Sequence, residues 1–538
     1  METNPRALIW WRGIATIAAM LAFCPSQADE SYSLDGAWIV ESVSPQGYIP
    51  QIVEFSKDTN GISGIWTSRP KWKDQKIGGV TVRGASITFR VGSTADFRGA
   101  LWQGRFVSRD VFVMRWMGEN GVFGSDGVPI WSRTFRRASR STLAALEADA
   151  PKDLITRKLP LPALRELASN GLALTPPMGW NSWNTFQDTI DDKTVREIAD
   201  ALVASGLRDV GYVYVNIDDG WQGRRDAHGI LQPNSKFPDM RGLADYVHAK
   251  GLKFGLYTVA GPISCVDKVG SHGYEEQDAG QFAKWGADFV KVDWCSAGEL
   301  YSFDVDGRAI FQKMGEALRE TGRPMVYSIC TGSRDWGLKA GVWGHKAGGN
   351  LWRTSEDSFV GNRWGSLSVR FDFDGVQSAN GPGGWNDPDI LLVGLQGLTV
   401  EENRTHMTLW SMLAAPLLLG NDIRRMSDAV SEILMNREVI AIDQDALGKQ
   451  GRRAVKNGET EIWTKPLADG STAIALFNRG AMDAEISANW SDLGLHGPQR
   501  VRDLWRHQEY DEGALEYRTV VPTHGSVLLR VAKASKAP

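Results

Sequence analysis

Residues 289–295, FVKVDWC, form an apolar run in which Lys291, Asp293 and Cys295 recur at every second position. Because side chains alternate along a β-strand, these three groups project from one face of the strand that the run predicts. Charged groups inside an apolar strand cost free energy unless a partner or a function requires them. The run therefore indicates a buried strand whose end presents either a structural ion pair or a catalytic carboxylate kept ionised by a lysine.

The segments around this strand alternate between apolar strands and amphipathic helices from residue 171 to residue 449. One helix is capped by Asp191-Asp192 and ends at Gly206. Repeated units of roughly 35 to 40 residues predict a (β/α)8 TIM barrel as the catalytic domain. A doubly wound open sheet is the alternative, but no glycine-rich phosphate loop follows the first strand. The other segments predicted here are strands at 213–217, 253–257, 325–330 and 351–354 and helices at 243–249 and 281–285.

The flanking regions lack this alternation. Residues 31–136 contain short alternating strands separated by glycine and aspartate turns, which predicts a small antiparallel β-barrel or sandwich. Residues 137–170 are charged and rich in alanine and leucine, and they predict a helical linker interrupted by Pro160 and Pro162. Residues 450–534 return to short strands and predict an antiparallel β-sandwich. The chain is therefore multidomain.

The composition limits the classes of partner. The chain of 538 residues has a formal net charge of −4 and 22 tryptophans. A chain without a basic surplus has no electrostatic footprint for nucleic acid, and we expect none as a partner. Tryptophans supply flat apolar surfaces for sugar rings, although most belong to cores. The sequence leaves the oligomeric state open.

The first 28 residues predict an export signal. Arg6 and Arg12 precede an apolar run that is too short to span a bilayer, and Ser26-Gln27-Ala28 is a small-residue cleavage site. We expect no membrane span elsewhere and a periplasmic or secreted location. Export permits disulfides. If Cys24 leaves with the signal, three cysteines remain, and the 30-residue spacing of Cys265 and Cys295 is compatible with a bridge.

Polar groups gather at the predicted carboxyl ends of the barrel strands, where TIM-barrel enzymes carry their function. A single aspartate at such a position is commonly a helix N-cap. Helix capping is a poor explanation for a series of acids beside tryptophan, tyrosine, lysine and arginine, whereas a polyol ligand accounts for all of them. The strand-end groups are Trp183, Asp218, Asp219, Tyr257, Lys291, Asp293, Arg353, Asp357, Asp387 and Asp389.

A metal site is not expected, and neither is a cofactor. Asp304–Gly307 and Asp372–Gly375 resemble fragments of calcium loops, but Lys313 and Gly381 stand where such loops carry glutamate. We interpret both segments as turns. The histidines do not have the spacing of zinc ligands.

Seven short motifs follow one another along the second part of the chain. They are TPPMGWNSWN (175–184), VNIDDGW (215–221), LADYV (243–247), KVDWC (291–295), WRT (352–354), GWNDPD (384–389) and APLLLGND (415–422). Together they resemble the motifs of glycoside hydrolase family 27, the α-galactosidase and α-N-acetylgalactosaminidase family. The resemblance covers residues 172 to about 533 and excludes the N-terminal β-domain. It implies a (β/α)8 barrel followed by an antiparallel β-domain, double displacement and no metal.

The resemblance also implies roles for individual residues. Asp293 matches the nucleophile and Asp357 the general acid/base. Asp218, Asp219 and Lys291 match groups that bind the sugar hydroxyls and select an axial 4-hydroxyl. The remaining matches are aromatic contacts at Trp183 and Tyr257, sugar-binding groups at Arg353 and Asp389, and a disulfide between Cys265 and Cys295.

One position departs from the family pattern. Thr331 stands where most α-galactosidases carry a glutamate that contacts the 2-hydroxyl. A smaller residue could admit a 2-acetamido group, unless Arg334 fills the space. The expected substrate is a terminal α-D-galactoside. The alternatives are an α-N-acetylgalactosaminidase, the β-L-arabinopyranosidase and dextran-cleaving specificities of the family, and a non-catalytic sugar-binding protein.

Double displacement sets requirements for the two acids. Lys291 should keep Asp293 ionised, and Asp357 must start protonated, so its pKa should be raised by burial or by the charge on Asp293. In retaining enzymes the two carboxyl groups lie about 5–5.5 Å apart. Glu356 is a neighbouring carboxylate, but the spacing from Arg353 favours Asp357 as the acid.

Overall fold

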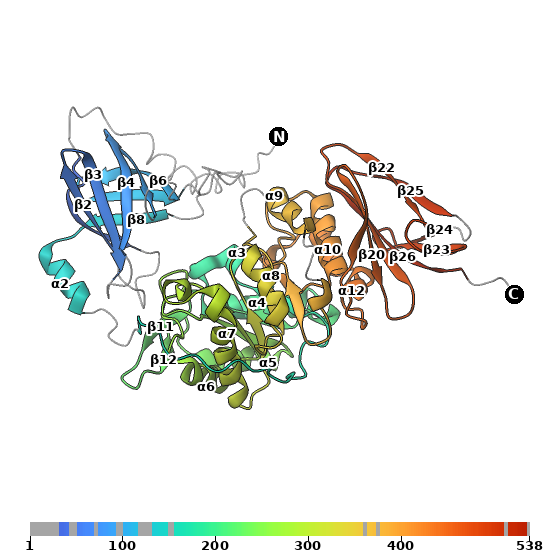
Figure 1. Ribbon diagram of the computed structural model, residues 1–538, viewed down its shortest axis with the longest axis horizontal. Helices are drawn as coiled ribbons and strands as arrows, with labels where there is room; N and C mark the ends of the chain where they lie inside the picture. The colour runs from blue at the N-terminus through green and yellow to red at the C-terminus, as the bar shows by residue number, and fades with distance from the viewer. Residues whose placement is uncertain are drawn as a thin grey trace, which may run out of the picture.

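The computed structural model describes residues 32–41, 51–68, 74–92, 100–116, 132–148, 155–358, 363–372, 377–510 and 515–534. The predicted export signal, residues 1–28, lies outside these ranges. Figure 1 shows an N-terminal β-barrel, a central α/β domain and a C-terminal β-domain in chain order. None of the described helices is long and apolar enough to cross a membrane.

The N-terminal domain is a closed antiparallel barrel in which every strand pairs with its neighbour in sequence, which decides between the predicted barrel and sandwich. Alternation places aromatic side chains inside, and Trp38, Phe112 and Phe135 are fully buried. The Phe112 and Phe135 rings stack with centroids 4.5 Å apart. The strands are β1 (Gly36–Glu41), β2 (Gln51–Asp58), β3 (Gly61–Ser68), β4 (Asp74–Arg83), β5 (Ser86–Val91), β6 (Ala100–Ser108), β7 (Val111–Trp116) and β8 (Ser132–Arg137).

The linker is helical over a shorter range than predicted. Helix α2 spans Arg140–Ala148, and residues 155–177 form no helix. The prediction of a helix across 137–170 is therefore wrong in its second half. There the backbone bonds to side chains of the central domain instead: Leu159 N–H donates to Tyr301 Oη at 2.7 Å and Arg165 N–H to Gln312 Oε1 at 3.0 Å.

The central domain is the predicted TIM barrel. Its eight strands are parallel, and a bridge between Leu391 and Leu419 joins the two ends of the sheet. In order around the barrel they are β17 (Trp385–Asp387), β16 (Leu351–Arg353), β15 (Val326–Ile329), β14 (Phe289–Asp293), β13 (Lys253–Val259), β10 (Tyr214–Asn216), β9 (Met178–Asn181) and β18 (Leu417–Leu419). A hairpin of β11 (Gln222–Arg225) and β12 (Leu231–Pro233) follows β10.

Helices cover the barrel. Asp191 caps α4 by accepting a hydrogen bond from Thr194 N–H, and Gly286 ends α6 with φ of 92°. The interpretation of Asp304–Gly307 as a turn is wrong, because these residues form the first turn of α7. The helices are α3 (Trp183–Phe186), α4 (Asp192–Ala204), α5 (Met240–Ala249), α6 (Glu275–Trp285), α7 (Phe303–Glu320), α8 (Arg334–Trp343), α9 (Arg363–Ser368), α10 (Val400–Leu413), α11 (Asp428–Leu434) and α12 (Arg437–Asp443).

The C-terminal domain contains a six-stranded antiparallel sheet and a two-stranded one. Trp463 and Phe477 belong to the same hydrophobic core as the barrel helices, so the two domains share buried surface. The larger sheet consists of β19 (Arg452–Asn457), β20 (Thr460–Pro466), β21 (Thr472–Asn478), β26 (Ser526–Lys533), β23 (Gln499–Asp503) and β24 (Gln508–Tyr510), and the smaller of β22 (Ala484–Asn489) and β25 (Glu516–Val521).

A buried ion pair joins the β11–β12 hairpin to α6. Arg225 donates to both carboxylate oxygens of Asp278 at 2.6 and 2.8 Å, and the two side chains are 1% and 0% exposed. We expect Arg225→Met to lower the free energy of unfolding by about 3–5 kcal/mol, because it leaves Asp278 buried without its partner. The midpoint of thermal unfolding measures this loss.

The control for this prediction is Arg241→Met. Arg241 and Asp245 form an ion pair of 2.9 Å whose side chains are 60% and 54% exposed, and such pairs contribute about 0–1 kcal/mol. Equal losses in the two variants would contradict the prediction.

Candidate active site

The candidate catalytic acids and sugar-binding groups lie at the carboxyl ends of adjacent barrel strands. Asp218 follows β10, Asp293 ends β14, Asp357 follows β16 and Asp389 follows β17. The barrel brings these ends to one rim because its strands are parallel. Trp183 begins α3 directly after β9 and is partly buried. Residues separated by up to about 200 positions in sequence thus gather at one end of the barrel, and we call this group of side chains the cup.

Lys291 binds Asp218. Its Nζ lies 2.8 Å from Asp218 Oδ2, and Asn181 Nδ2 donates to the same oxygen at 2.8 Å. Lys291 shares its strand with Asp293, but its direct hydrogen bond is to Asp218. Burial opposes the charge of the ammonium, but the carboxylates of Asp218 and Asp293 raise the pKa of Lys291. The lysine remains a fixed positive charge in the cup.

Asp293 is held by two donors. Its Oδ1 accepts the Trp294 backbone N–H at 2.7 Å, and its Oδ2 accepts the Tyr257 hydroxyl at 3.3 Å. Burial raises the pKa of Asp293, and the Asp357 carboxylate adds to this, whereas Lys291 acts in the opposite direction. The charge of Lys291 thus reaches Asp293 through space and favours its ionised form.

Asp219 sits beneath a tight loop. The carboxylate is buried, with Oδ1 accepting Gly220 N–H at 2.9 Å and Oδ2 accepting Val266 N–H at 3.2 Å. Burial raises the pKa of Asp219 to about 7. A disulfide between Cys265 and Cys295 fixes the same loop next to Tyr257, and it has a Cα–Cα distance of 5.4 Å.

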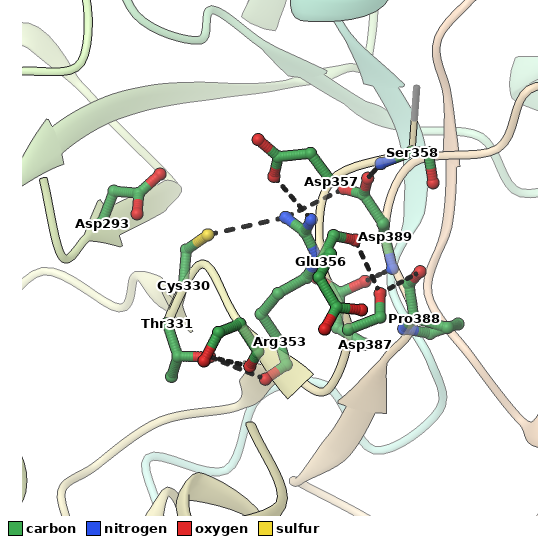
Figure 2. Close-up of polar contacts among 12 residues, drawn as sticks. Asp293, Cys330, Thr331, Arg353, Glu356, Asp357, Ser358, Asp387, Pro388 and Asp389 are labelled. Carbon is green, nitrogen blue, oxygen red and sulfur yellow. Dashed lines mark hydrogen bonds and ion pairs between the residues drawn. The ribbon is translucent and has the colours of Figure 1, made fainter. Parts of the chain in front are cut away.

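Arg353 occupies the opposite side of the cup. Its side chain is 3% exposed, with Nη2 2.7 Å from Asp357 Oδ1 and Nη1 3.0 Å from Asp389 Oδ1. Nη1 also donates to the Cys330 thiol sulfur at 3.5 Å, and Figure 2 shows the guanidinium between Cys330 and Asp357. Asp389 in turn accepts Ser358 N–H at 2.6 Å, which anchors the segment that carries Asp357.

The expected rise in the pKa of Asp357 is wrong for this structure. Desolvation within the cup opposes ionisation, but the charge and hydrogen bond of Arg353 lower the pKa of Asp357 overall. The Asp357 side chain is 65% exposed, so a ligand can reach it from solvent. An acid role for Asp357 therefore requires that substrate draw Arg353 away or bury the carboxyl group further.

The comparisons with known proteins agree on one family. The chain matches the description "Alpha galactosidase A" over residues 175–445 and "Alpha galactosidase C-terminal beta sandwich domain" over residues 457–531. The α-galactosidase of Cyamopsis tetragonoloba is 44% identical over 368 residues, which are 67% of this chain and 87% of that protein. The chain belongs to glycoside hydrolase family 27.

Solved structures give the same assignment. α-Galactosidase I of Mortierella vinacea is similar to this family 27 chain with a TM-score of 0.63 and 34% identity, over 69% of this chain and 100% of its own. A Bacteroides fragilis structure has a TM-score of 0.64 and 30% identity over 92% of this chain and 91% of its own. The second match covers more than the catalytic and C-terminal domains together, so its similarity extends into the N-terminal region.

Thr331, the departure from the family 27 pattern, lies below the cup surface. The residue is buried, and its hydroxyl lies 3.3 Å from the carbonyl oxygens of Ser333 and Arg353. Its hydroxyl hydrogen is therefore directed to the backbone of the protein. Arg334 Nη2 donates to the Asp372 carbonyl oxygen at 2.5 Å.

Two neighbours of the site carried no role in the sequence analysis. Arg370 is 2% exposed and donates to the carbonyl oxygens of Pro388 and Glu356 at 3.2 and 2.6 Å, which ties together the segments that carry Asp389 and Asp357. Burial lowers the pKa of Arg370 to about 10. Asn181 lies within the motif of residues 175–184, and nothing in the local sequence indicates its hydrogen bond to Asp218. No local pattern marks Arg370.

Metal binding finds little support among the described residues. Cys265, Asp293 and Cys295 have ligand atoms within 4.8 Å of one another, but the two cysteines form a disulfide. A thiolate, not a disulfide sulfur, is the ligand that metals bind. This group therefore offers a metal a single carboxylate.

The position of Lys291 leads to a pH prediction. Lys291→Met removes the charge that lowers the pKa of Asp293. If Asp293 reacts as the anion, the acid limb of the kcat/KM profile should move to higher pH, because ionisation of Asp293 then requires a lower proton concentration. The pH profile with an aryl glycoside measures this shift. Lys253→Met is the control, because Lys253 begins β13 and so lies at the other end of the barrel from the candidate site. An acid limb at the same pH in the Lys291 variant would contradict the assignment.

Proposed function

We propose that this family 27 protein is a retaining exo-glycosidase that removes terminal α-D-galactosyl residues by double displacement. Asp293 is the nucleophile, and Asp357 is the general acid and base. The observation that carries the proposal is the placement of both carboxylates in one strand-end cup beside fixed sugar-binding groups. The names of the relatives support galactose as the sugar.

In the first step, the Asp293 carboxylate attacks the anomeric carbon while Asp357 protonates the departing glycosidic oxygen. The hydrogen bonds from Trp294 N–H and the Tyr257 hydroxyl aim Asp293. In the second step, Asp357 removes a proton from water, which attacks the glycosyl ester and regenerates Asp293. The anomeric configuration is retained because two inversions occur.

Binding of the sugar uses groups whose geometry is already fixed. Asp218 and Lys291 form one hydrogen-bonded pair that can accept from and donate to adjacent hydroxyls. Tyr257 packs against this pair, with Lys291 Nζ 5.1 Å from its ring centroid. Asp219, Arg353, Asp389 and Trp183 complete the proposed set. Asp357 becomes protonated only when its ion pair with Arg353 is weakened. A sugar hydroxyl that binds the Arg353 guanidinium would compete with Asp357 for it.

The test is a panel of aryl α- and β-glycosides that includes galactose, 2-acetamido-galactose, L-arabinopyranose and glucose. We expect the α-galactoside to be cleaved with the highest kcat/KM and the released sugar to be the α-anomer, as observed by NMR. Faster cleavage of the 2-acetamido sugar would reassign the specificity. Release of the β-anomer would overturn double displacement, and binding of galactose without turnover would favour a sugar-binding protein.

Export is part of the same proposal. Residues 1–28 carry the pattern of a signal peptide, and the Cys265–Cys295 disulfide is of the kind that persists in oxidising compartments. An enzyme outside the cytoplasm would meet α-galactoside oligosaccharides or polysaccharides before their uptake. The substrate is its expected partner.

A further inference from the structure

The N-terminal barrel touches the loop that holds Asp219. Gln51, the first residue of β2, donates through Nε2 to Asp267 Oδ1 at 2.5 Å. Gln51 is itself oriented, because Trp66 Nε1 donates to its Oε1 at 2.6 Å. Trp66 is 9% exposed and packs on Phe135 in the core of the N-terminal barrel. The amide therefore approaches Asp267 from a rigid support.

A second side chain at the same end of the N-terminal barrel faces Asp267. Strand β1 pairs with β2 through Val40 and Gln51 and with β8 through Val40 and Phe135, so Arg133 lies two residues from the position that faces Gln51 across β1. The Arg133 guanidinium lies near enough to act on the charges of Asp267 and Lys268. The N-terminal barrel thus presents an amide donor and a positive charge to one carboxylate.

The loop that receives this contact is built around Asp219. Ile263 and Val269 form an antiparallel bridge, and between them Ser264 N–H donates to the Lys268 carbonyl oxygen at 2.8 Å. The Ser264 hydroxyl and Val266 N–H both bind Asp219, the latter at 3.2 Å. Asp267 turns the chain with φ of 61°, a conformation that aspartate adopts more readily than most residues.

From these contacts we propose that the N-terminal barrel is part of the sugar-binding apparatus, with Gln51 as a positioning residue. Gln51 holds Asp267, and the loop of residues 263–269 then holds the carboxylate of Asp219 in the cup. This inference rests on the proposed role of Asp219 in binding a sugar hydroxyl. The N-terminal barrel then affects substrate affinity and not the chemical steps, because the contacts of Gln51 are with Asp267 and Trp66 and not with Asp293 or Asp357.

The test replaces the amide by a carboxylate of the same size. Gln51→Glu removes the donor and places a negative charge against Asp267. We expect KM for an aryl α-galactoside to rise roughly three- to tenfold, a change within the range that substitutions between two coupled sites produce. The value of kcat should change less than about twofold, because the reacting groups are untouched. The control Gln103→Glu introduces the same charge at an exposed position of β6.

A rescue separates positioning from loss of folding. In the Gln51→Glu background, Asp267→Asn supplies an amide donor to the new carboxylate, and we expect KM to return to within about twofold of the wild-type value. Hydrogen exchange of the backbone amides in residues 263–269 is the readout that does not depend on activity. Exchange should be faster in Gln51→Glu and slow again in the double variant.

The outcomes distinguish the two proposals. A wild-type enzyme that cleaves no α-galactoside would overturn the proposed function, and the exchange measurement would still test the contact. An active wild type whose KM and exchange respond to Gln51→Glu no more than to Gln103→Glu would overturn the positioning role. A rise in KM that Asp267→Asn fails to reverse would also overturn it.

Discussion

Asp293→Asn should lower kcat for an aryl α-galactoside by at least about 10⁴-fold, because the amide cannot form the glycosyl ester. The fold should tolerate the change. Asparagine can still accept the Trp294 N–H, which lies 2.7 Å from Oδ1, and can exchange a hydrogen bond with the Tyr257 hydroxyl at Oδ2. The substitution is nearly isosteric, so the binding constant for galactose should remain within about tenfold of the wild-type value.

Steady-state kinetics and calorimetric titration with galactose measure these two quantities on the same preparation. Asp218→Asn is the informative comparison, since it alters the carboxylate that binds Lys291 and should weaken galactose binding. A variant of Asp293 that turns over at the wild-type rate would remove it as the nucleophile. Loss of both turnover and the folded state would instead identify a structural aspartate.

Asp357→Ala should slow the cleavage of poor leaving groups far more than that of good ones. General acid catalysis contributes about 10²–10⁴-fold where the leaving oxygen needs a proton, and little where the departing phenolate is already stable. We therefore expect a kcat/KM loss near the upper end of this range for an unactivated galactoside and a much smaller loss for a dinitrophenyl galactoside. A plot of log kcat/KM against leaving-group pKa displays the difference as a steeper slope.

Glu356→Ala is the matched control, because Glu356 adjoins Asp357 and is exposed, with its carboxylate accepting Arg334 N–H at 3.2 Å. Its slope should equal that of the wild type. Equal losses on good and poor leaving groups in the Asp357 variant would count against acid catalysis. A steeper slope in the Glu356 variant alone would transfer the role to Glu356.

The fold was predictable where local pattern and packing agree. The strand of residues 289–293 and the helix beginning at Asp192 appear in the structure as their hydrophobic periodicity predicts. The pattern failed at Asp304–Gly307, where acidic residues typical of turns instead occupy the first turn of α7. Acidic groups suit that position because they interact favourably with the positive end of the helix. The helix predicted beyond Ala148 is absent from residues 155–170 for another reason, because contacts with distant residues fix the conformation of the chain there.

The site was predictable in its residue types and less so in its pairings. The sequence correctly placed Lys291 and Asp293 on one strand, yet the lysine binds Asp218, which follows a strand two positions away around the barrel. Such contacts depend on strand order, which a sequence pattern does not contain. The expectation of a protonated Asp357 failed for a different reason, because it followed from the requirements of catalysis and left out the charge of Arg353 four residues earlier, which pairs with Asp357.

Among the residues that the structure describes, the two outermost strands of the larger C-terminal sheet, β19 and β24, pair on one side only. An unpaired strand of this kind can template the addition of a strand from another molecule, and proteins commonly oppose this with cationic side chains or very short strands. Strand β19 carries Arg452, Arg453 and Lys456, and β24 is three residues long. Addition of a strand from another molecule at either edge of this sheet is thereby disfavoured.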